Sequence, residues 1–215
     1  MELSVTLIII IITCLVSVGG FYNQRIINDL IFYPPAVSEN NHWYRFISCG
    51  LIHADFGHLA FNMYALYIFG VHVETGFGFI FGSAGKTIYV IMYISALVAC
   101  LLPTYSKHKN DYYYRSLGAS GAVSAVIFSF ILLFPLQKMG LIFIPVMIPG
   151  FIFGLLYLGV STFLEKKAAD NVNHSAHIWG AFYGIGFLIA MGYAMSDYPV
   201  LSRFIEQVKT YLTGF

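Results

Sequence analysis

Residues 117–130 read LGASGAVSAVIFSF, so a serine flanked by glycines stands at the start of an otherwise apolar run. A helix that crosses the ~30 Å hydrocarbon layer of a membrane needs about 20 apolar residues. The run continues to residue 134, and a membrane-spanning helix is therefore predicted over 117–134. Ser120, near the beginning of that helix and between two glycines, is a polar group that spanning a membrane does not require.

The rest of the chain is equally apolar. Of its 215 residues, 59% are hydrophobic and only 10% are charged, whereas about 25% are charged in ordinary soluble domains. These values predict an all-α membrane protein, a bundle of six transmembrane helices that forms one domain over 1–215, with loops and short tails elsewhere. The predicted spans are 3–20, 56–73, 86–103, 117–134, 140–163 and 174–195.

Charge and cysteine usage exclude several other classes of protein. The net charge is +1 and the eleven basic residues are scattered, so there is no dense basic patch for nucleic acid. Cys14, Cys49 and Cys100 are far apart and odd in number, which indicates packing residues rather than disulfides or metal ligands. An acidic residue and no Lys or Arg precede the first apolar run, which favours a retained span over a secretory signal.

Two further segments have distinctive compositions. Residues 21–55 combine apolar residues, a Pro-Pro pair and the sequence WYR at 43–45, which is typical of a loop in the headgroup region of a membrane. The fifth span contains Pro145, Pro149 and Gly150. Because these residues weaken a helix, we expect the fifth span to be kinked and relatively mobile.

Polar side chains recur near the start of alternate spans. Successive spans alternate in direction, so the second, fourth and sixth spans begin at the same face of the membrane. His58 and Asn62 lie near the start of the second span, Ser120 near the start of the fourth, and His177 near the start of the sixth. At a rise of about 1.5 Å per residue, we expect these four side chains to lie at similar depth, just below one surface.

Small residues line one face of two of these spans. They are Gly118, Ala122, Ala125 and Ser129 in the fourth span, and Gly180 and Gly184 in the sixth. Faces of small residues let helix backbones approach closely in lipid, so contact between these faces would bring His177 toward Ser120. Gly118 and Gly121 would also leave room beside Ser120 for a peptide backbone.

The four polar residues suit nucleophilic catalysis. A serine hydroxyl becomes a good nucleophile when a base removes its proton, and a neutral imidazole such as that of His177 can do so near neutral pH. Ser120 at a helix N-terminus has free backbone N–H groups beside it, and His58 and Asn62 can donate further hydrogen bonds to an oxyanion. The alternative is structural, because membrane serines commonly bond a backbone carbonyl and such polar residues can tie helix ends together.

With these residues the sequence resembles the rhomboid intramembrane serine proteases, over nearly the whole chain from the second span to the sixth. The G-x-S-G signature is GASG at 118–121, and A-H-x-x-G-x-x-x-G is AHIWGAFYG at 176–184. H-x-x-x-N is HLAFN at 58–62, and G-x-x-x-E is GVHVE at 70–74. Each motif alone is weak, whereas four motifs in the right order on the right spans are a specific match.

The resemblance implies an intramembrane serine endopeptidase without metal or cofactor, whose catalytic dyad has no third carboxylate and lies in a water-filled cavity. Ser120 would be the nucleophile and His177 the general base and then general acid. The Ser120 amide, His58 and Asn62 would form the oxyanion hole. Substrates would be other proteins of the lipid bilayer, cut where a transmembrane helix is destabilised, with the fifth span and residues 165–173 as gate and cap.

The resemblance also implies a location. Six spans are typical of a bacterial plasma-membrane form with its active site toward the extracytoplasmic side. The N-terminus would then be inside, which puts four basic residues on the cytoplasmic side and seven outside. The positive-inside rule favours the opposite orientation, so the charge count and the resemblance conflict.

The sequence departs from the family pattern in two places. Family members commonly carry an aromatic residue four positions after the serine, beneath the histidine ring, and Ser124 occupies that position here. An aromatic ring for His177 must come from elsewhere or be absent. The Trp-Arg pair of the first loop is WYR at 43–45, with one extra residue. Glu74 is expected to help form a turn at the cytoplasmic end of the second span.

Other polar residues and other functions were weighed against this interpretation. We expect His53, Asp55, His72, His108 and His174 to be solvated at loop edges, and Asp55, Asp111 and Asp170 are candidates for orienting a histidine. The H-E-x-x-H pattern of zinc proteases is missing, and so are the paired broken helices of transporters. The remaining alternative is an inactive rhomboid-like adaptor or chaperone that binds transmembrane clients, although such proteins typically lack the serine or the histidine.

Overall fold

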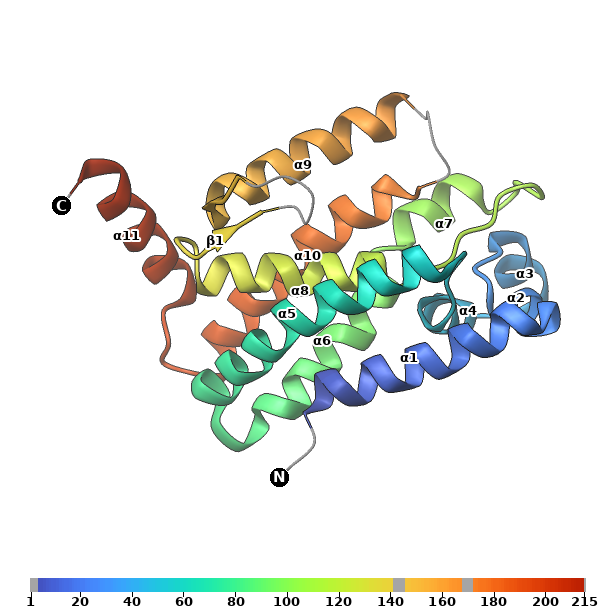
Figure 1. The fold of residues 1–215 in the computed structure, drawn as a ribbon, viewed down its shortest axis with the longest axis horizontal. Coiled ribbons are helices and arrows are strands. Elements are labelled where there is room, and N and C mark those ends of the chain that lie inside the picture. The colour runs from blue at the N-terminus through green and yellow to red at the C-terminus, as the bar shows by residue number, and fades with distance from the viewer. Residues whose placement is uncertain (1–3, 141–145, 168–171, 215) are drawn as a thin grey trace.

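The computed structural model describes residues 4–140, 146–167 and 172–214, which form a bundle of α-helices (Figure 1). The helices are α1 (Val5–Tyr22), α2 (Gln24–Leu30), α3 (Pro34–Asn40), α4 (Arg45–Ser48), α5 (Phe56–Phe81), α6 (Gly85–Ala99), α7 (Leu102–His108), α8 (Ser120–Leu133), α9 (Gly150–Lys167), α10 (His174–Met195) and α11 (Val200–Thr213), with 3-10 turns η1 (Cys49–Leu51) and η2 (Gly82–Ala84). Strands β1 (Lys138–Met139) and β2 (Ile148–Pro149) pair antiparallel. The predicted all-α fold class is confirmed.

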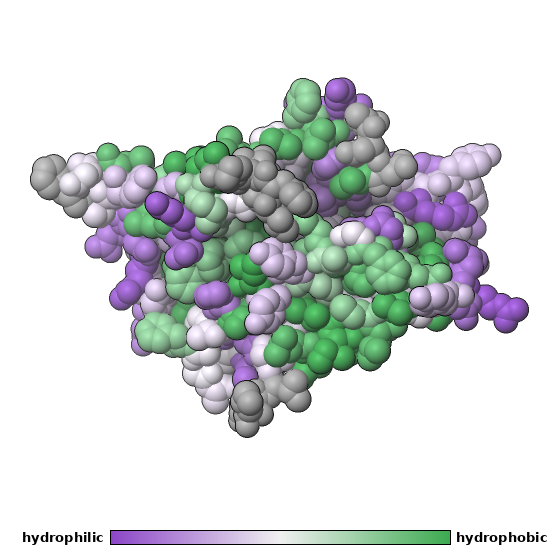
Figure 2. All heavy atoms as spheres, in the orientation of Figure 1, coloured by the Kyte–Doolittle hydropathy of each residue, from purple (hydrophilic) through white to green (hydrophobic). Residues whose placement is uncertain are grey.

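Several of these helices have the composition of membrane spans. Three helical segments of the described chain are long and apolar enough to cross a membrane: Val5–Tyr22, Phe56–His108 (which holds α5, α6 and α7) and His174–Met195. α8 is apolar but shorter. In Figure 2 hydrophobic residues fill the middle of the visible face, and the most hydrophilic residues gather toward its ends. The count of six spans stays a prediction.

α8 is the central helix of the bundle. It packs against α5, α6, α9 and α10, and all of residues 121–133 are buried. Figure 1 shows α8 running between α5 and α10. A helix that is apolar all round belongs in such a place, because each of its faces then meets another helix. Only the first residue of α8, Ser120, is partly exposed.

The boundaries of the elements agree with the predicted spans to different extents. α10 coincides with the predicted span 174–195, whereas α5 continues to Phe81, beyond the predicted end at residue 73. The expectation that residues after 195 form only a tail is wrong, because α11 occupies Val200–Thr213. Its polar and apolar residues alternate with a helical period, a signal that a search for uninterrupted apolar runs does not register.

The prediction of a kinked helix over 140–163 is wrong. β2 lies where its first part was expected and pairs with β1, which lies just before residue 140, with Met139 opposite Ile148 and Lys138 opposite Pro149. α9 begins only at Gly150, so Pro149 lies before the helix and removes none of its hydrogen bonds. Pro145 lies outside the described residues.

Glu74 joins the start of α1 to α5, so the expected turn-forming role is wrong. Its buried carboxylate, inside α5, accepts hydrogen bonds from the Ser4 hydroxyl (2.5 Å), the Val5 N–H (2.8 Å), and the Thr6 N–H (2.9 Å) and hydroxyl (2.8 Å). A carboxylate there satisfies the free N–H groups of the first turn of α1 and complements its dipole. The link holds α1 along the bundle.

The first loop is ordered around Arg45. The Arg45 side chain is 7% exposed, and its Nη1 donates to the carbonyl oxygens of Asn28 (2.9 Å) and Ile31 (2.7 Å). Trp43 stacks on Phe46 with ring centroids 6.0 Å apart. Arg45 therefore fixes the turn after α2, and Trp43 packs the loop. The location of this loop in the headgroup region of the membrane stays a prediction.

Candidate active site

The segment before α8 is held in place by backbone hydrogen bonds. Ser116 and Phe32 form an antiparallel bridge, and the Gly118 N–H donates to the Cys49 carbonyl oxygen (2.9 Å). Gly118 has φ +111°, a conformation that residues with a Cβ rarely adopt. This turn aims the chain into α8 so that Ser120 begins the helix, where the backbone N–H groups of the first turn lack helical partners.

The structure brings Ser120 and His177 into contact. The Nε2 atom of His177, on the first turn of α10, lies 2.8 Å from the Oγ atom of Ser120. Both side chains are partly exposed. This is the distance at which an imidazole can take the proton of a hydroxyl.

Close backbone contact between α8 and α10 produces this geometry. A Cβ atom added at Gly180 would lie 2.0 Å from the Gly121 carbonyl oxygen, and one added at Gly184 would lie 2.2 Å from the Ala125 carbonyl oxygen. Any side chain there would force the two helices apart. The predicted faces meet at Ala125 and Gly184, and Gly121, which was not assigned to that face, adds the contact with Gly180. Together these contacts carry His177 to Ser120.

His58 and Asn62 lie beside the same site on α5. The His58 ring packs against Gly118, where an added Cβ atom would lie 2.8 Å from His58 Cε1 and 3.0 Å from Nε2. Asn62 is buried, and its Nδ2 donates to the carbonyl oxygen of His58 (3.0 Å). The His58 ring thus lies next to the turn that precedes Ser120, and Asn62 follows one helical turn further along α5.

One cavity of about 1260 Å³ joins these side chains, and Ser120, His177, His58 and Asn62 all line it. From the polar end the cavity runs between α5, α8 and α9 to Gln137 and the neighbouring β1 strand. α8 separates these two ends and rises roughly 20 Å over its 14 residues. The cavity therefore follows most of the length of α8, with polar residues at one end and chiefly apolar walls beyond them.

An aromatic side chain from α9 occupies the neighbourhood of His177. The Tyr157 ring centroid lies 6.3 Å from that of His177, with an interplanar angle of 36°. The Tyr157 hydroxyl lies 2.6 Å from the Ser124 hydroxyl, which also donates to the Ser120 carbonyl oxygen (2.9 Å). Because a hydroxyl has one proton, Tyr157 is the donor to Ser124. The ring missing at position 124 thus comes from another helix.

His53 is a residue whose place the sequence analysis missed. It was expected to be solvated, yet its side chain is 0% exposed. Its Nε2 accepts from the Ala119 N–H (3.4 Å), its Nδ1 lies 3.0 Å from Ser17 Oγ, and its ring meets the His58 ring edge-on at 4.9 Å. Burial lowers the pKa of His53 to about 3, and the neighbouring His58 adds to this shift while Asp55 opposes it. His53 is therefore a neutral support under the turn that leads to Ser120.

The other singled-out histidines have different surroundings. His174 is 7% exposed, so its expected solvation is wrong, and its ring meets His177 edge-on at 5.7 Å. His72 is exposed, but it lies inside α5 and not at a loop edge as expected. His108 is partly buried against the Tyr114 ring at 3.8 Å. Loop-edge position indicates exposure only where no other element covers the loop.

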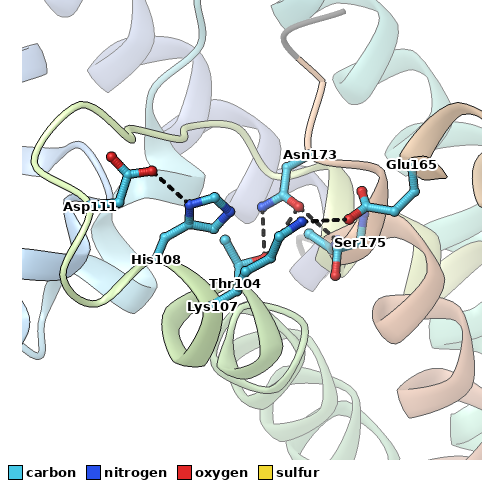
Figure 3. A network of polar contacts seen from close by, with 8 residues as sticks. Thr104, Lys107, His108, Asp111, Glu165, Asn173 and Ser175 are labelled. Carbon is cyan, nitrogen blue, oxygen red and sulfur yellow. Dashed lines mark hydrogen bonds and ion pairs between the residues drawn. The ribbon is translucent and has the colours of Figure 1, made fainter. Parts of the chain in front are cut away.

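The three candidate carboxylates also differ. Asp111 contacts His108, with Oδ2 3.0 Å from Nδ1 (Figure 3). Asp55 is exposed and caps α5 by accepting the backbone N–H of His58 (2.8 Å). Asp170 lies outside the described residues. Of the two candidates that the structure describes, Asp111 contacts a histidine ring through its side chain.

A polar network ties the ends of three helices together near the site (Figure 3). Glu165 of α9 lies 3.5 Å from the Lys107 ammonium of α7 and accepts the backbone N–H of Ser175 at the start of α10 (2.9 Å). Asn173 caps α10 and exchanges hydrogen bonds with Thr104. These contacts hold the end of α9 against the helix that carries His177.

Comparisons with known proteins agree with this architecture. A family model described as Rhomboid domain matches residues 40–194. The chain is 29% identical over 144 residues to "RHOMBOID-like protein 12, mitochondrial" of Arabidopsis thaliana, which covers 63% of this chain and 42% of that protein. It is 27% identical over 143 residues to the rhomboid protein YdcA of Bacillus subtilis (strain 168), which covers 66% of this chain and 63% of that protein.

The family match extends over well over half of the chain, from the first loop to the end of α10, and includes α5, α8 and α10 with their contacts around Ser120. The chain spans less than two thirds of the length of either relative. Together with the apolar helices, the match identifies a multi-pass integral membrane protein. The chain belongs to the rhomboid family.

Proposed function

We propose that this protein is an intramembrane serine endopeptidase in which Ser120 is the nucleophile and His177 is the general base and then the general acid. The observation that carries the proposal is the 2.8 Å separation of His177 Nε2 and Ser120 Oγ. A serine and a histidine that only packed helices together would not need to share the wall of a cavity. Here both line a space large enough for an extended peptide.

The chemical steps follow from this contact. His177 Nε2 takes the proton of Ser120 as Oγ attacks the carbonyl carbon of the scissile peptide bond. The protonated His177 then gives that proton to the leaving amine nitrogen, so the C–N bond breaks and an acyl ester remains on Ser120. Water, activated by His177 in the same way, hydrolyses the ester and restores both residues.

The negative oxygen formed in each step needs hydrogen-bond donors. In the proposal these are the Ser120 backbone N–H, His58 and Asn62. Ser120 is the first residue of α8, so its N–H lies at the positive end of that helix. The His58 ring adjoins Gly118, and Asn62 can release its bond to the His58 carbonyl oxygen and turn its amide toward the cavity. Gly118 keeps the space beside His58 free of a side chain, whereas the missing side chain of Gly121 makes room for Cys100.

The shape and chemistry of the cavity support transmembrane segments of other membrane proteins as substrates. The cavity borders α5, α8 and α9, and most of its walls are apolar. A segment that is helical in lipid has to unwind before its backbone can reach Ser120, and the polar end of the cavity can bind the exposed N–H and C=O groups. Segments with weak helices near the membrane surface should therefore be cut preferentially.

The proposed location is a bacterial plasma membrane, with the Ser120 end of the cavity toward the extracytoplasmic side. The count of basic residues favours the opposite orientation, so a direct measurement is needed. Cysteines introduced at exposed Tyr113, near the Ser120 end, and at Thr213, in α11, should react with membrane-impermeant maleimide from outside at residue 113 only. Labelling at residue 213 alone would show the opposite orientation, with the Ser120 end of the cavity toward the cytoplasm.

The activity can be tested on the purified full chain. Incubation with a panel of transmembrane peptides and mass spectrometry of the products should show cleavage that Ser120→Ala and His177→Ala each abolish. A fluorophosphonate probe should label the protein at Ser120. Ser202→Ala, which removes an exposed serine on α11, is the matched control and should be labelled like the native chain.

Two results would contradict the proposal. Cleavage that continues at an undiminished rate in Ser120→Ala would exclude Ser120 as the nucleophile. A folded protein that binds transmembrane peptides but is neither labelled nor active would instead support the inactive adaptor.

A further inference from the structure

α11 differs from the helices of the bundle in the distribution of its side chains. At 100° per residue, its polar and apolar residues occupy separate halves of the helix surface. The apolar half consists of Val200, Leu201, Phe204, Ile205, Val208, Tyr211 and Leu212. The polar half consists of Ser202, Arg203, Glu206, Gln207, Lys209, Thr210 and Thr213. No polar residue falls within the apolar half, so the surface of α11 suits a boundary between apolar and aqueous surroundings.

One edge of the apolar half docks α11 on the bundle. Val200 is 4% exposed and belongs to the core, and Phe204 packs against that core. Tyr211 contacts Phe151, near the start of α9, with ring centroids 5.8 Å apart. In Figure 1, α11 runs across the end of the bundle where α10 ends, whereas the long helices run along it.

The other edge of the apolar half is exposed in the described part of the chain. Leu201, Ile205 and Leu212 are 45%, 53% and 68% exposed, and they follow one another along the helix. Arg203 and Glu206 lie on the far side of the helix from them, Lys209 borders Ile205, and all three charged residues are exposed. If α11 lay in water, this apolar edge would have no favourable partner.

We propose that α11 is an interfacial lipid-binding helix, with its outer apolar edge (Leu201, Ile205 and Leu212) among the upper acyl chains of one leaflet and its polar half in the headgroup region. Lys209 borders the outer apolar edge on the polar half, so its long side chain can reach lipid phosphates. Arg203 lies on the opposite side of the helix, with its guanidinium 4.8 Å from the centroid of the Tyr198 ring. An amphipathic helix in the plane of the interface satisfies both of its halves at once.

Continuity with the lipid-facing surface favours lipid over a protein partner. Apolar and aromatic side chains next to α11 in the chain and in space are also exposed, with Tyr193 and Met195 at the end of α10 and Leu155 on α9. In a multi-pass membrane protein these side chains face acyl chains. The outer edge of α11 continues this surface at the end of the bundle, so the same lipid covers both.

The placement can be tested by tryptophan fluorescence of the full chain in phosphatidylcholine vesicles that contain lipids brominated in the upper acyl chain. Leu212→Trp puts the probe on the outer apolar edge, and Thr213→Trp puts it on the adjacent polar half. Emission from each is taken relative to the native chain, which has two tryptophans. We expect several-fold more bromine quenching for Leu212→Trp than for Thr213→Trp, and the reverse order for aqueous acrylamide.

Other outcomes would overturn the proposal. Equal acrylamide quenching of both probes, with no bromine quenching, would place α11 in water. A Leu212→Trp probe shielded from both quenchers at high protein density, and exposed to acrylamide on dilution in lipid, would show that a second copy of the chain covers the edge. The same quenching is expected when each probe is combined with Ser120→Ala, because lipid contact of α11 does not depend on catalysis. The lipid-binding proposal can therefore fail or hold independently of the proposed protease activity.

Discussion

The hydroxyl of Tyr157 lies 2.6 Å from that of Ser124, although the two residues belong to different helices. Ser124 in turn donates to the carbonyl oxygen of Ser120, so a chain of hydrogen bonds runs from α9 to the proposed nucleophile. The Tyr157 ring lies beside His177 as well. The position of α9 is thereby linked to both members of the proposed dyad.

Tyr157→Phe should lower kcat/KM for a transmembrane peptide about fivefold, because one hydrogen bond of about 1 kcal/mol that steadies the ring is lost. Tyr157→Leu should lower it further, since the ring beside His177 disappears too. Kinetics in detergent micelles measure both effects. Tyr193→Phe, which removes a hydroxyl from a side chain that is 93% exposed, is the control. Native kinetics in Tyr157→Leu would show that the ring does not position His177.

Gly180→Ala should both destabilise the protein and reduce cleavage strongly. The new Cβ atom would lie 2.0 Å from the Gly121 carbonyl oxygen, and neither backbone can move without separating α8 from α10. Overpacking of this kind typically costs about 1–3 kcal/mol of the free energy of unfolding. Gly186→Ala on the same helix is the matched control, because its Cβ atom would meet nothing within 4 Å. Equal melting temperatures for the two variants would contradict the close contact.

Glu74→Ala should lower the free energy of unfolding by about 3 kcal/mol, because four donors at the start of α1 lose a buried charged acceptor. Glu74→Gln keeps one oxygen acceptor and should lose less. Thermal unfolding in detergent compares these variants with Thr75→Ala, an exposed neighbour on α5. If Glu74→Ala unfolds like Thr75→Ala, α1 is held by packing alone.

Acid should destabilise the fold through His53. The pKa of His53 is about 3 in the folded protein and near 6.5 when unfolded, because burial disfavours its charged form. Between these values the unfolded chain binds more protons, so the free energy of unfolding falls as the pH decreases below about 6.5, by at most ~1.4 kcal/mol per pH unit. Above that pH the contribution of His53 is constant.

The measurement is the melting temperature from pH 7.5 to 4.5 for the native chain and His53→Gln. The glutamine oxygen can still accept the Ala119 N–H, but it does not titrate. Titration of other groups is common to both proteins, so the difference between the two pH profiles isolates His53. Identical profiles would mean that His53 is not held neutral by burial.

Much of the fold followed from local properties of the chain. The apolar runs predicted α1, α8 and α10 at or near their observed places, because about 20 apolar residues in a helix suit a bilayer whatever surrounds them. Alternation of span direction predicted that Ser120, His58 and His177 begin their helices at one end of the bundle. Small residues on α8 and α10 predicted the face on which those helices meet.

Contacts between distant segments could not be predicted in this way. The burial of His53 under the turn before α8, the Tyr157 ring beside His177 and the capping of α1 by Glu74 each join residues far apart in the chain. Hydropathy and spacing specify how each helix sits in lipid, but leave open how it is rotated and what it touches laterally. The rotation and lateral contacts of each helix depend on packing among all helices at once, so only the tertiary structure decides them.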